Sequence, residues 1–383
     1  MVIFSASNER ESRVKAYPMD KDRYIALGLM SGTSLDGVDV AIIETDGFEI
    51  FGFGDTAESN FSKDDKTILQ AATQDALDWG FAGPPPNSFA RAEDVVDRVH
   101  VDAIGALTAD IIGYHGQTIL HHPPLNSQDG QTLQLGRGRT LADELGVPVV
   151  YDFRTADVSA GGQGAPLAPI YHEALCRYSG LSGRNAVLNI GGVSNVSLIE
   201  DGQLQWATDC GPGNGPLDSW IVSNSAGSFD RDGLLSFEGV VDHAMINQWL
   251  EQSFFARPIP RSADRYDFDV LDDLQGYSLE DGAATLAAFC AQSIATVLEA
   301  GNVDRVIVCG GGRRNPAIVT MLDIHTDAEV IRAEDVGWDG DMLEAQAFAY
   351  LAVRSLKNLP ISFPSTTGAP APKTGGRIIY PKA

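Results

Sequence analysis

Residues 28–39 read GLMSGTSLDGVD, and they separate two apolar runs, 24–27 and 40–43. A turn between two strands needs only about two to five residues, with glycine or asparagine where φ is positive, so this segment holds more hydroxyls and backbone donors than turning requires. Backbone N–H groups and small hydroxyls at a hairpin tip can form a nest that binds phosphate oxygens without a lysine. For this turn alone, an ordinary Gly/Ser hairpin is the simpler interpretation.

A second hairpin of the same kind lies about half a chain further on. Residues 185–208 read NAVLNIGGVSNVSLIEDGQLQWAT, which predicts a strand, a turn at 191–195, a strand, an Asp-Gly turn and a third strand. The first apolar runs, the turn at 45–47 and the run 48–53 predict the same three-strand meander. A matching pair of turns favours phosphate binding at both, and two similar meanders predict two similar halves. The turns 32–39 and 191–195 are called the first and second phosphate hairpins below.

The rest of the chain alternates helical and strand-like segments, which indicates mixed α/β sheets covered by helices. The expected helices are 67–77, 90–109, 138–146, 166–179, 239–251, 282–300 and 342–357, and the expected strands are 111–114, 147–150 and 305–309. We expect a loose extension at 1–23, a first domain at 24–180 and a second at 181–383. The Pro-, Gly- and Thr-rich run 362–376 fits either a linker or an ordered loop.

The composition of the chain limits the classes of function that are plausible. The 383 residues include 27 basic and 52 acidic side chains, a net charge of −25, which disfavours nucleic acid or an anionic membrane surface as partner. No stretch approaches the length of a membrane span, and the first residues lack the pattern of a signal peptide, so we expect a cytoplasmic protein. The four cysteines form no CxxC pair, which favours reduced thiols.

A third glycine segment, CGGGRRNP at 309–316, follows the expected strand 305–309 and opens a helix. Asn315 suits the N-cap and Pro316 the first helical position, so the unpaired N–H groups of the helix face the glycines 310–312. Three glycines let a flat group or a phosphate approach the backbone closely, whereas a tight connection needs only one. No GxxxxGK[ST] occurs, and 136–141 fails the GxGxxG pattern, which argues against a P-loop kinase or a dinucleotide enzyme.

Two further groups of polar residues have competing interpretations. Asp209 ends the second meander before a glycine loop, where a carboxylate can act as a general base or simply cap a turn, and the residues alone leave both open. The histidines 115, 121 and 122 with Asp152 match no familiar zinc spacing, which favours surface or substrate contacts over metal ligands. The acidic run 264–273 lacks the pattern of a calcium loop and predicts a solvated face.

Taken together, these segments resemble the anhydro-N-acetylmuramic acid kinase family, within the superfamily of actin and the hexokinase-type sugar kinases. The resemblance spans about residues 25–380. Its motifs are GLMSGTSLDGVD (28–39), GYHGQT (113–118), DFRTAD (152–157), GGQGAPL (161–167), NIGGVSN (189–195), DCGPGN (209–214), CGGGRRNP (309–316), LEAQAFAYLA (343–352), FPSTTGAPAP (363–372) and GGRI (375–378). One such motif alone is weak evidence for the family, but this many motifs in the same order are specific evidence for it.

The resemblance implies two ribonuclease-H-like domains with ATP and Mg²⁺ between them, a homodimer, and an amino-sugar substrate. In such a kinase, water attacks the anomeric carbon of a 1,6-anhydro sugar while the released O6 takes the γ-phosphoryl group. The nucleotide-binding residues would be Gly32, Thr33, Ser34, Leu35, Asp36, Gly37, Val38, Asp39, Gly191, Gly192, Ser194, Asn195, Gly310, Gly311, Gly312 and Asn315. The substrate-side residues would be His115, Gln117, Thr118, Gly211, Gly213 and Asn214.

In this resemblance Asp209 matches the base that deprotonates the water, and Glu344 a helix carboxylate that helps to position it. An ordinary ionised carboxylate can accept that proton, and positioning and charge neutralisation supply most of the remaining catalysis. Three places depart from the family pattern. Cys210 stands where threonine is common and could add sensitivity to oxidation, residues 261–265 replace a different loop, and Leu29 occupies the place of a magnesium-directed aspartate in hexokinase-type relatives.

Three alternatives remain open at this point. The sugar could be levoglucosan or another 1,6-anhydro sugar instead of the muramic acid derivative. The chain could be an actin-like ATP switch without enzymatic activity, although a switch has no need of a water-activating pair of carboxylates. An ATP-independent hydrolase of the anhydro bond fits poorly with three glycine segments.

Overall fold

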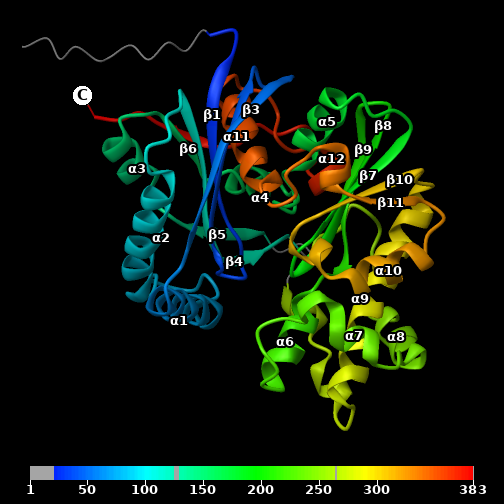
Figure 1. Cartoon of the computed structure of the whole chain (residues 1–383). Helices are drawn as coiled ribbons and strands as arrows, with labels where there is room; N and C mark the ends of the chain where they lie inside the picture. The colour runs from blue at the N-terminus through cyan, green and yellow to red at the C-terminus, as the bar shows by residue number, and fades with distance from the viewer. Residues whose placement is uncertain (1–20, 125–128, 264, 383) are drawn as a thin grey trace, which may run out of the picture.

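The computed structural model describes residues 21–124, 129–263 and 265–382. Most of the extension expected at 1–23 lies outside the described residues. The described chain forms two α/β lobes side by side, each built on one sheet (Figure 1).

The first sheet has the order β12-β6-β4-β1-β2-β3, with β5 paired to β4. Its strands are β1 (Tyr24–Ser31), β2 (Gly37–Thr45), β3 (Ile50–Asn60), β4 (Ile111–His122), β5 (Gln131–Leu135), β6 (Val149–Tyr151) and β12 (Arg377–Ile379). The first three strands are antiparallel, and β4 and β6 run parallel to β1.

The second sheet repeats this arrangement in the order β11-β10-β7-β8-β9. Its strands are β7 (Arg184–Ile190), β8 (Val193–Glu200), β9 (Gln203–Pro212), β10 (Arg305–Cys309) and β11 (Glu329–Arg332). Strands β7, β8 and β9 form the antiparallel meander, and β10 and β11 run parallel to β7. Both sheets thus share one strand order and one set of directions, that of the ribonuclease-H-like fold, which confirms the predicted fold class.

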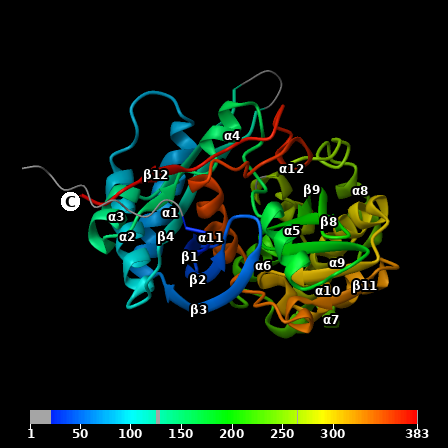
Figure 2. The same ribbon diagram turned by 90° about the horizontal axis from the view of Figure 1, so that it is seen from above.

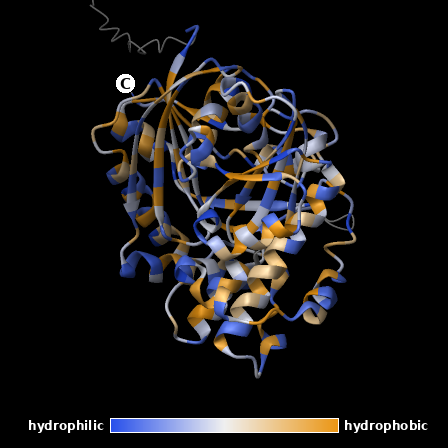
Figure 3. Ribbon diagram, turned by 45° about the vertical axis from the view of Figure 1, so that its right-hand side comes forward, coloured by the Kyte–Doolittle hydropathy of each residue, from blue (hydrophilic) through white to orange (hydrophobic). Residues whose placement is uncertain are grey.

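Helices cover both sheets. The longer ones are α1 (Lys63–Trp79), α2 (Ser88–Ile104), α3 (Gly138–Leu145), α5 (Pro169–Tyr178), α6 (Gly215–Ser223), α8 (His243–Leu250), α9 (Leu279–Gly301), α10 (Pro316–Ile324) and α11 (Leu343–Leu356). The short ones are α4 (Thr155–Ser159), α7 (Leu234–Glu238), α12 (Pro364–Thr367) and the 3₁₀ turns Arg231–Gly233, Arg265–Phe268, Leu271–Leu274, Gly311–Arg314 and Ala333–Val336. In Figure 3 the outer helices carry hydrophilic and hydrophobic residues together, as expected for helices that cover a sheet on one side.

The buried side chains form three layers. One core lies between the first sheet and helices α1, α2 and α3. A second lies between the second sheet and helices that include α6, α8, α9 and α10. The third joins residues of both sheets with α5 and α11, and Figure 2 shows α11 between the two lobes. The two lobes therefore share a hydrophobic layer, and α11 is part of it.

Helix α11 rests directly on the first sheet. A Cβ added to Gly28 in β1 would lie 1.8 Å from the carbonyl oxygen of Ala345, and one added to Gly113 in β4 would lie 2.1 Å from that of Phe348. No side chain fits at either position, so glycine is required for this close approach. The contact fixes the first turn of α11, which carries Glu344, beside the 28–39 segment.

The structure differs from the sequence-based expectations at several element boundaries. The helix expected at 239–251 is α8, which begins only at His243 because Asp242 caps it by accepting hydrogen bonds from the backbone N–H groups of Ala244 and Met245. The helix expected at 90–109 ends at Ile104, before Gly105. Strand β12 pairs with β6 of the first sheet and α11 packs against β1, β2 and β4 of that sheet, although both follow residue 180, where the sequence predicts the second domain.

Among the described residues, α9 is the one helix long and apolar enough to cross a membrane by length and composition. Its most apolar window is 78% buried inside the protein. This helix lies in the core of the second lobe, packed against the second sheet. Burial of this kind is typical of a core helix.

Candidate active site

Asp209 lies near the end of β9, paired across the sheet with Asn195 of β8. Its side chain is buried, at 6% exposure, and its Oδ2 accepts a hydrogen bond of 2.8 Å from the backbone N–H of Ala263. Burial raises the pKa of Asp209 from 3.8 to about 7, against the Ala263 hydrogen bond and the charges of Arg154 and Arg261, which lower it. The carboxyl is therefore not the ordinary acid that the sequence suggested, because it is poised to exchange a proton near neutral pH.

A loop at 259–263 supports Asp209 through its main chain. The carbonyl oxygen of Arg261 accepts hydrogen bonds from the backbone N–H of Asp209 at 2.9 Å and from the hydroxyl of Thr208 at 3.2 Å. The guanidinium of Arg261 packs over the ring of Phe254 at 4.5 Å and donates to the carbonyl of Phe255 at 2.9 Å. The sequence alone predicts no role for this loop, and the structure places it against Asp209.

Arg154 and His115 form a second pair, from the DFRTAD and GYHGQT motifs. His115 contacts the carbonyl of Gly116 through Nδ1 at 2.8 Å, and Arg154 donates to His115 Nε2 from Nε at 3.1 Å and from Nη2 at 3.0 Å. Since a carbonyl only accepts and a guanidinium only donates, His115 is neutral with its proton on Nδ1. Burial, together with the charge of Arg154, holds the pKa of His115 well below its usual value. Both ring nitrogens are engaged by the protein, so His115 contributes by orienting Arg154.

Arg154 links the two predicted catalytic carboxylates. Its positive charge acts on Asp209, which ends a strand of the second sheet, and on Glu344, which lies on the helix that packs against the first sheet. Glu344 is exposed to solvent, yet the protein around it raises its pKa. The half-buried cation of Arg154 thus acts on both Asp209 and Glu344.

The first phosphate hairpin presents its tip to solvent. Thr33 and Ser34 are exposed there, whereas the side chains of Leu35 and Val38 are buried in the core of the first lobe, so these two could serve a ligand only through the backbone. Leu35 has a φ of 58°, in the left-handed region, and donates its N–H to the carbonyl of Gly32 at 3.2 Å. The tip is thus a tight turn with small hydroxyls, as the sequence predicted.

Gly32 is also held by a predicted substrate-side residue. Gln117 donates from Nε2 to the carbonyl of Gly32 at 3.1 Å. The hydroxyl of Thr118 accepts from Gln134 at 3.3 Å. Gln117 therefore joins β4 to the first phosphate hairpin.

The second phosphate hairpin packs against the glycine loop that follows Asp209. Gly213 donates its N–H to the carbonyl of Gly192 at 3.0 Å, and Asn214 donates to that of Gly191 at 2.8 Å. The hydroxyl of Ser194 is buried and donates to the carbonyls of Gly211 and Pro212, the latter at 3.0 Å. Ser194 therefore ties β8 to β9, which leaves the glycines as the accessible part of this turn.

The glycine loop 310–312 lies against the end of β7. A Cβ on Gly310 would lie 2.1 Å from the side-chain oxygen of Asn189, one on Gly312 would lie 2.2 Å from Ile190, and one on Gly311 would meet nothing within 4 Å. Two of the glycines thus serve a close approach within the protein, and only Gly311 faces open space.

Asn315 caps α10, as the sequence predicted. Its side chain accepts from the backbone N–H groups of Ala317 at 3.0 Å and Ile318 at 3.3 Å. The same arginine-rich turn connects the glycine loop to the start of α11: Arg313 donates to the carbonyl of Gly310 at 3.0 Å and to Asp341 at 2.8 Å.

Acidic side chains crowd the space between the first phosphate hairpin and α11. Burial and the negative charges of Glu344, Asp341, Glu58 and Asp36 raise the pKa of Asp39 to about 7. The described residues nevertheless contain no group of three or more His, Cys, Asp or Glu side chains that could hold a metal ion. The side chains present therefore do not form a complete magnesium cage, and a bound ion would need most of its ligands from elsewhere.

Buried polar atoms without a hydrogen-bond partner also mark this region. Among the described residues there are four such side-chain atoms: Gln117 Oε1, Asn214 Oδ1, Ser262 Oγ and His100 Nε2. The first three belong to segments that surround Asp209 or the phosphate hairpins. Since buried polar groups are nearly always paired, these three atoms indicate a place where a polar ligand completes the hydrogen bonding.

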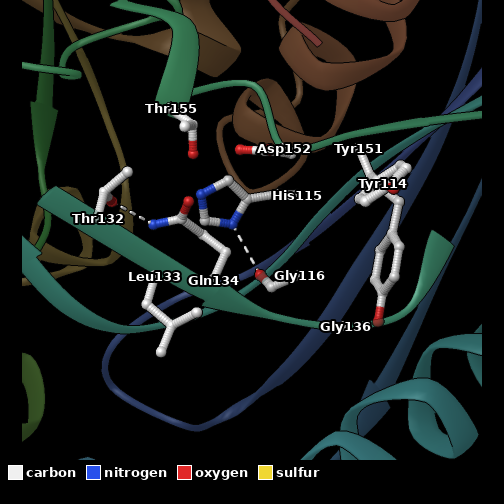
Figure 4. Close-up of a pocket in the computed structure, with 10 residues that line it drawn as sticks. All are labelled: Tyr114, His115, Gly116, Thr132, Leu133, Gln134, Gly136, Tyr151, Asp152 and Thr155. Atoms are coloured by element: carbon white, nitrogen blue, oxygen red, sulfur yellow. Dashed lines mark hydrogen bonds between the residues drawn. The ribbon is translucent and has the colours of Figure 1, made fainter. Parts of the chain in front are cut away.

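A pocket of about 150 Å³ opens beside His115 in the first lobe. It is lined by Tyr114, His115, Gly116, Thr132, Leu133, Gln134, Gly136, Tyr151, Asp152 and Thr155. Figure 4 shows His115 surrounded by the polar side chains of Asp152, Thr155 and Gln134, while Tyr114 points away from them. The lining does not include Asp209 or Glu344, so this pocket is not centred on the two predicted catalytic carboxylates.

Two expectations about cysteines have different outcomes. All four cysteines are free, in agreement with the predicted reduced thiols. Cys210, in contrast, is fully buried, and burial raises the pKa of its thiol far above the usual value. A buried, protonated thiol is unreactive, so the oxidation sensitivity expected at this position is not supported by its surroundings.

Arg154 and Arg313 lie in the DFRTAD and CGGGRRNP motifs, but the sequence alone predicts no role for either residue. Arg154 donates to His115 and to the carbonyl of Gly164, and Arg313 donates to the carbonyl of Gly310 and to Asp341. A usable signal was present, because a cation inside a motif of small and acidic residues is typical of a site that neutralises charge. Their contacts, however, join segments far apart in the sequence.

Comparison with known proteins assigns the family. The family model for anhydro-N-acetylmuramic acid kinase matches residues 23–382. An anhydro-N-acetylmuramic acid kinase of Phenylobacterium zucineum is 47% identical over 93% of this chain and 99% of its own, and one of Caulobacter vibrioides is 46% identical over 92% and 98%.

Solved structures with a similar course of the chain are much more distant. They include the activator of 2-hydroxyisocaproyl-CoA dehydratase from Clostridium difficile with bound ADPNP, at 14% identity, 88% and 96% coverage and a TM-score of 0.44. Another is a ROK family glucokinase from Streptomyces griseus with glucose and AMPPNP, at 12% identity, 86% and 99% coverage and a TM-score of 0.40. At these scores they add nothing to the assignment, which rests on the match along nearly the whole chain. This protein belongs to the anhydro-N-acetylmuramic acid kinase family.

Proposed function

We propose that this protein is an ATP-dependent kinase that opens the 1,6-anhydro ring of 1,6-anhydro-N-acetylmuramic acid with water and phosphorylates O6. The products are N-acetylmuramic acid 6-phosphate and ADP, a step in peptidoglycan recycling. The family assignment supports the substrate. The observation that carries the chemistry is that the charge of Arg154 acts both on Asp209, near the end of a strand of the second sheet, and on Glu344, on the helix that packs against the first sheet.

Asp209 is the proposed general base. The oxygen of water attacks the anomeric carbon, its proton passes to the Asp209 carboxylate, and the bond between that carbon and O6 breaks. The electron pair left on O6 forms the new bond to the γ-phosphorus, while the bond from that phosphorus to the oxygen that stays on ADP breaks and ADP leaves with its electron pair. A base with a pKa of about 7 is ionised in a large fraction of molecules at neutral pH and still binds a proton well enough to take it from attacking water.

Glu344 is proposed to position the attacking water, and Arg154 to balance the negative charge of the carboxylates. Glu344 is accessible to water and lies on α11, whose place is fixed by the contact with Gly28, so it is suited to orient the attacking water. Arg154 is held by His115 and by the carbonyl of Gly164 at 2.7 Å, and its charge favours the ionised form of both carboxylates. The cation thereby keeps the base competent although the site is buried.

The nucleotide would lie against the first phosphate hairpin, the glycines of the second and the glycine loop 310–312. ATP supplies the γ-phosphoryl group, and Mg²⁺ bound to its phosphates would reduce the repulsion from the carboxylates around Asp39. Gln117 Oε1, Asn214 Oδ1 and Ser262 Oγ are the polar atoms left for the ligands. We further propose a cytoplasmic homodimer, as the family resemblance implies.

The test is release of ADP with 1,6-anhydro-N-acetylmuramic acid, together with the position of phosphate on the product. Asp209→Asn is expected to lower turnover at least about a hundredfold, the low end of what a positioned general base supplies. Asp102→Asn, an exposed change on α2, is the matched control and should turn over like the wild type.

Three results would contradict the proposal. Native turnover in Asp209→Asn would remove this residue from the chemistry. A strong preference for levoglucosan would overturn the substrate, and nucleotide binding without sugar-dependent ADP release would favour a switch.

A further inference from the structure

Gln163 lies at the junction between two segments that surround the proposed active site. It belongs to the GGQGAPL segment, and its main chain is fixed on both sides: its N–H donates to the carbonyl of Thr367 at 2.7 Å, and His121 donates to its carbonyl at 2.9 Å. Asp157 holds the next residue, because its Oδ2 accepts from the N–H of Gly164 at 2.7 Å. The position of the Gln163 backbone is therefore set independently of its side chain.

The side-chain amide of Gln163 reaches across to the loop 259–263. Nε2 donates to the carbonyl of Pro260 at 3.0 Å, and Oε1 accepts from the backbone N–H of Ser262. The amide thus donates to one backbone group and accepts from a second backbone group two residues further along the chain. A neighbouring β-strand would pair with the loop in the same way. This pairing fixes the loop in one conformation.

The next backbone N–H along that loop belongs to Ala263, and it is the group that binds the carboxylate of Asp209. The carbonyl of Arg261, between the two groups that Gln163 holds, accepts from the N–H of Asp209. Gln163 thus holds the loop on both sides of the Arg261 carbonyl and at the residue before the Ala263 N–H, the two groups that bind Asp209. Nothing in the described residues places Gln163 in contact with Asp209 itself.

We propose that Gln163 is a positioning residue, which acts on Asp209 through the main chain of loop 259–263. The proposal rests on the proposed function of Asp209 and deepens it. A base must lie within hydrogen-bonding distance of the proton that it takes, so a loop that moves by a fraction of an ångström changes the rate without changing the reaction.

The acid limb of the pH profile of kcat/KM separates a positioning role from a merely structural one. A residue that only stabilises the fold would leave the pH of this limb unchanged. The charged groups that act on Asp209 are Arg154 from the first lobe, and Arg261 and Asp267 from the segment after α8. The N–H of Ala263 favours the ionised carboxylate. When Gln163 no longer holds the loop, this hydrogen bond weakens and the acid limb moves to higher pH.

The experiment compares Gln163→Met, which keeps the length of the side chain and removes both amide bonds, with the wild type and with Gln74→Met, a matched change on the exposed face of α1. Gln163→Met is expected to lower kcat about tenfold, with an unchanged KM for ATP and a raised acid limb. Gln163→Glu keeps an acceptor for Ser262 and loses the donor to Pro260, so an intermediate loss is expected.

The same substitution in an Asp209→Asn background separates positioning from general damage. If Gln163 acts through Asp209, the residual rate of the double variant should match that of Asp209→Asn within about twofold. A full further loss of about tenfold would overturn the proposal, as would a native rate and pH profile in Gln163→Met. If the wild type itself shows no activity on the anhydro sugar, the proposed function fails. Urea unfolding and ATP binding, measured for each variant, then still report whether its fold is intact.

Discussion

Asp209 is a residue at which stability and activity are expected to oppose each other, and Asp209→Asn separates the two. Burial raises the pKa of Asp209 from 3.8 to about 7 in the folded protein, and the unfolded chain exposes it to water. Between these pH values the folded state keeps a proton that the unfolded state has released. Stability is therefore lost as the pH rises through this range, and the loss is complete above about pH 7.

The magnitude follows from the shift of the pKa. One pKa unit corresponds to about 1.4 kcal/mol, so a shift of about three units costs the folded state about 4 kcal/mol at pH 8. At pH 5 the unfolded state has already released most of its protons from this group, and the cost is about 2 kcal/mol. Asparagine resembles the protonated acid in shape and keeps an oxygen to accept from Ala263, so it avoids this cost.

Urea unfolding of the wild type and Asp209→Asn at pH 5 and pH 8 measures the effect. The variant is expected to be the more stable of the two at pH 8, and its advantage over the wild type should grow by about 2 kcal/mol from pH 5 to pH 8. Comparing the two pH values cancels any effect of the substitution that does not depend on pH. Asp102→Asn should show no such growth. An equal difference at both pH values would refute the raised pKa and the buried state of Asp209.

The remaining predictions concern charge and the glycine loop. Arg154→Met is expected to lower kcat/KM at pH 7 at least about a hundredfold, and part of this loss should be recovered at pH 9, because the charge of Arg154 favours the ionised carboxylates. A loss that is the same at every pH would contradict this electrostatic role. For the wild type, kcat/KM should rise with pH to a plateau above about pH 7, and a flat profile from pH 5 to 9 would exclude Asp209 as the titrating base. Gly312→Ala places a Cβ 2.2 Å from Ile190 and should raise the KM for ATP about tenfold, whereas Gly52→Ala, whose Cβ meets nothing within 4 Å, should not.

The sequence predicted the two meanders and their turns because these depend on local patterns. Alternating apolar residues and Gly or Asp at the turns specify each antiparallel meander over about thirty residues. The N-cap at Asn315 was predicted for the same reason, since cap and helix are adjacent in the chain. The strand 305–309 matches β10 in both bounds.

Elements that depend on distant partners could not be predicted in this way. Strand β12 has three residues and pairs with β6, and β11 has four and pairs with β10. The return of α11 to the first sheet requires the glycines at 28 and 113, which the sequence shows only as two residues of strand-like segments. A strand interior with glycine is a sign of close backbone approach, but it does not name the partner.

The electrostatics of the site show the same limit. Asp209 was read from its place at a strand end, and its role and that of Glu344 came from the family resemblance. The raised pKa of Asp209 comes from burial, and the cation that acts on both carboxylates lies 55 residues before Asp209 in the chain, at Arg154. Charges that meet only in the folded protein leave no spacing in the sequence from which to derive them.

The loop 259–263 explains how a site can keep its geometry while its side chains depart from the family pattern. Asp209 is bound there by the carbonyl of Arg261 and the N–H of Ala263, and every non-proline residue offers these two groups. What the sequence must preserve is the path of the main chain, which Gln163 and the contacts of the Arg261 guanidinium with the carbonyls of 254, 255 and 257 fix from opposite sides. Substitutions within the loop at positions other than 261 are therefore expected to matter less than loss of the residues that hold it, and Gln163 becomes the more informative position to change.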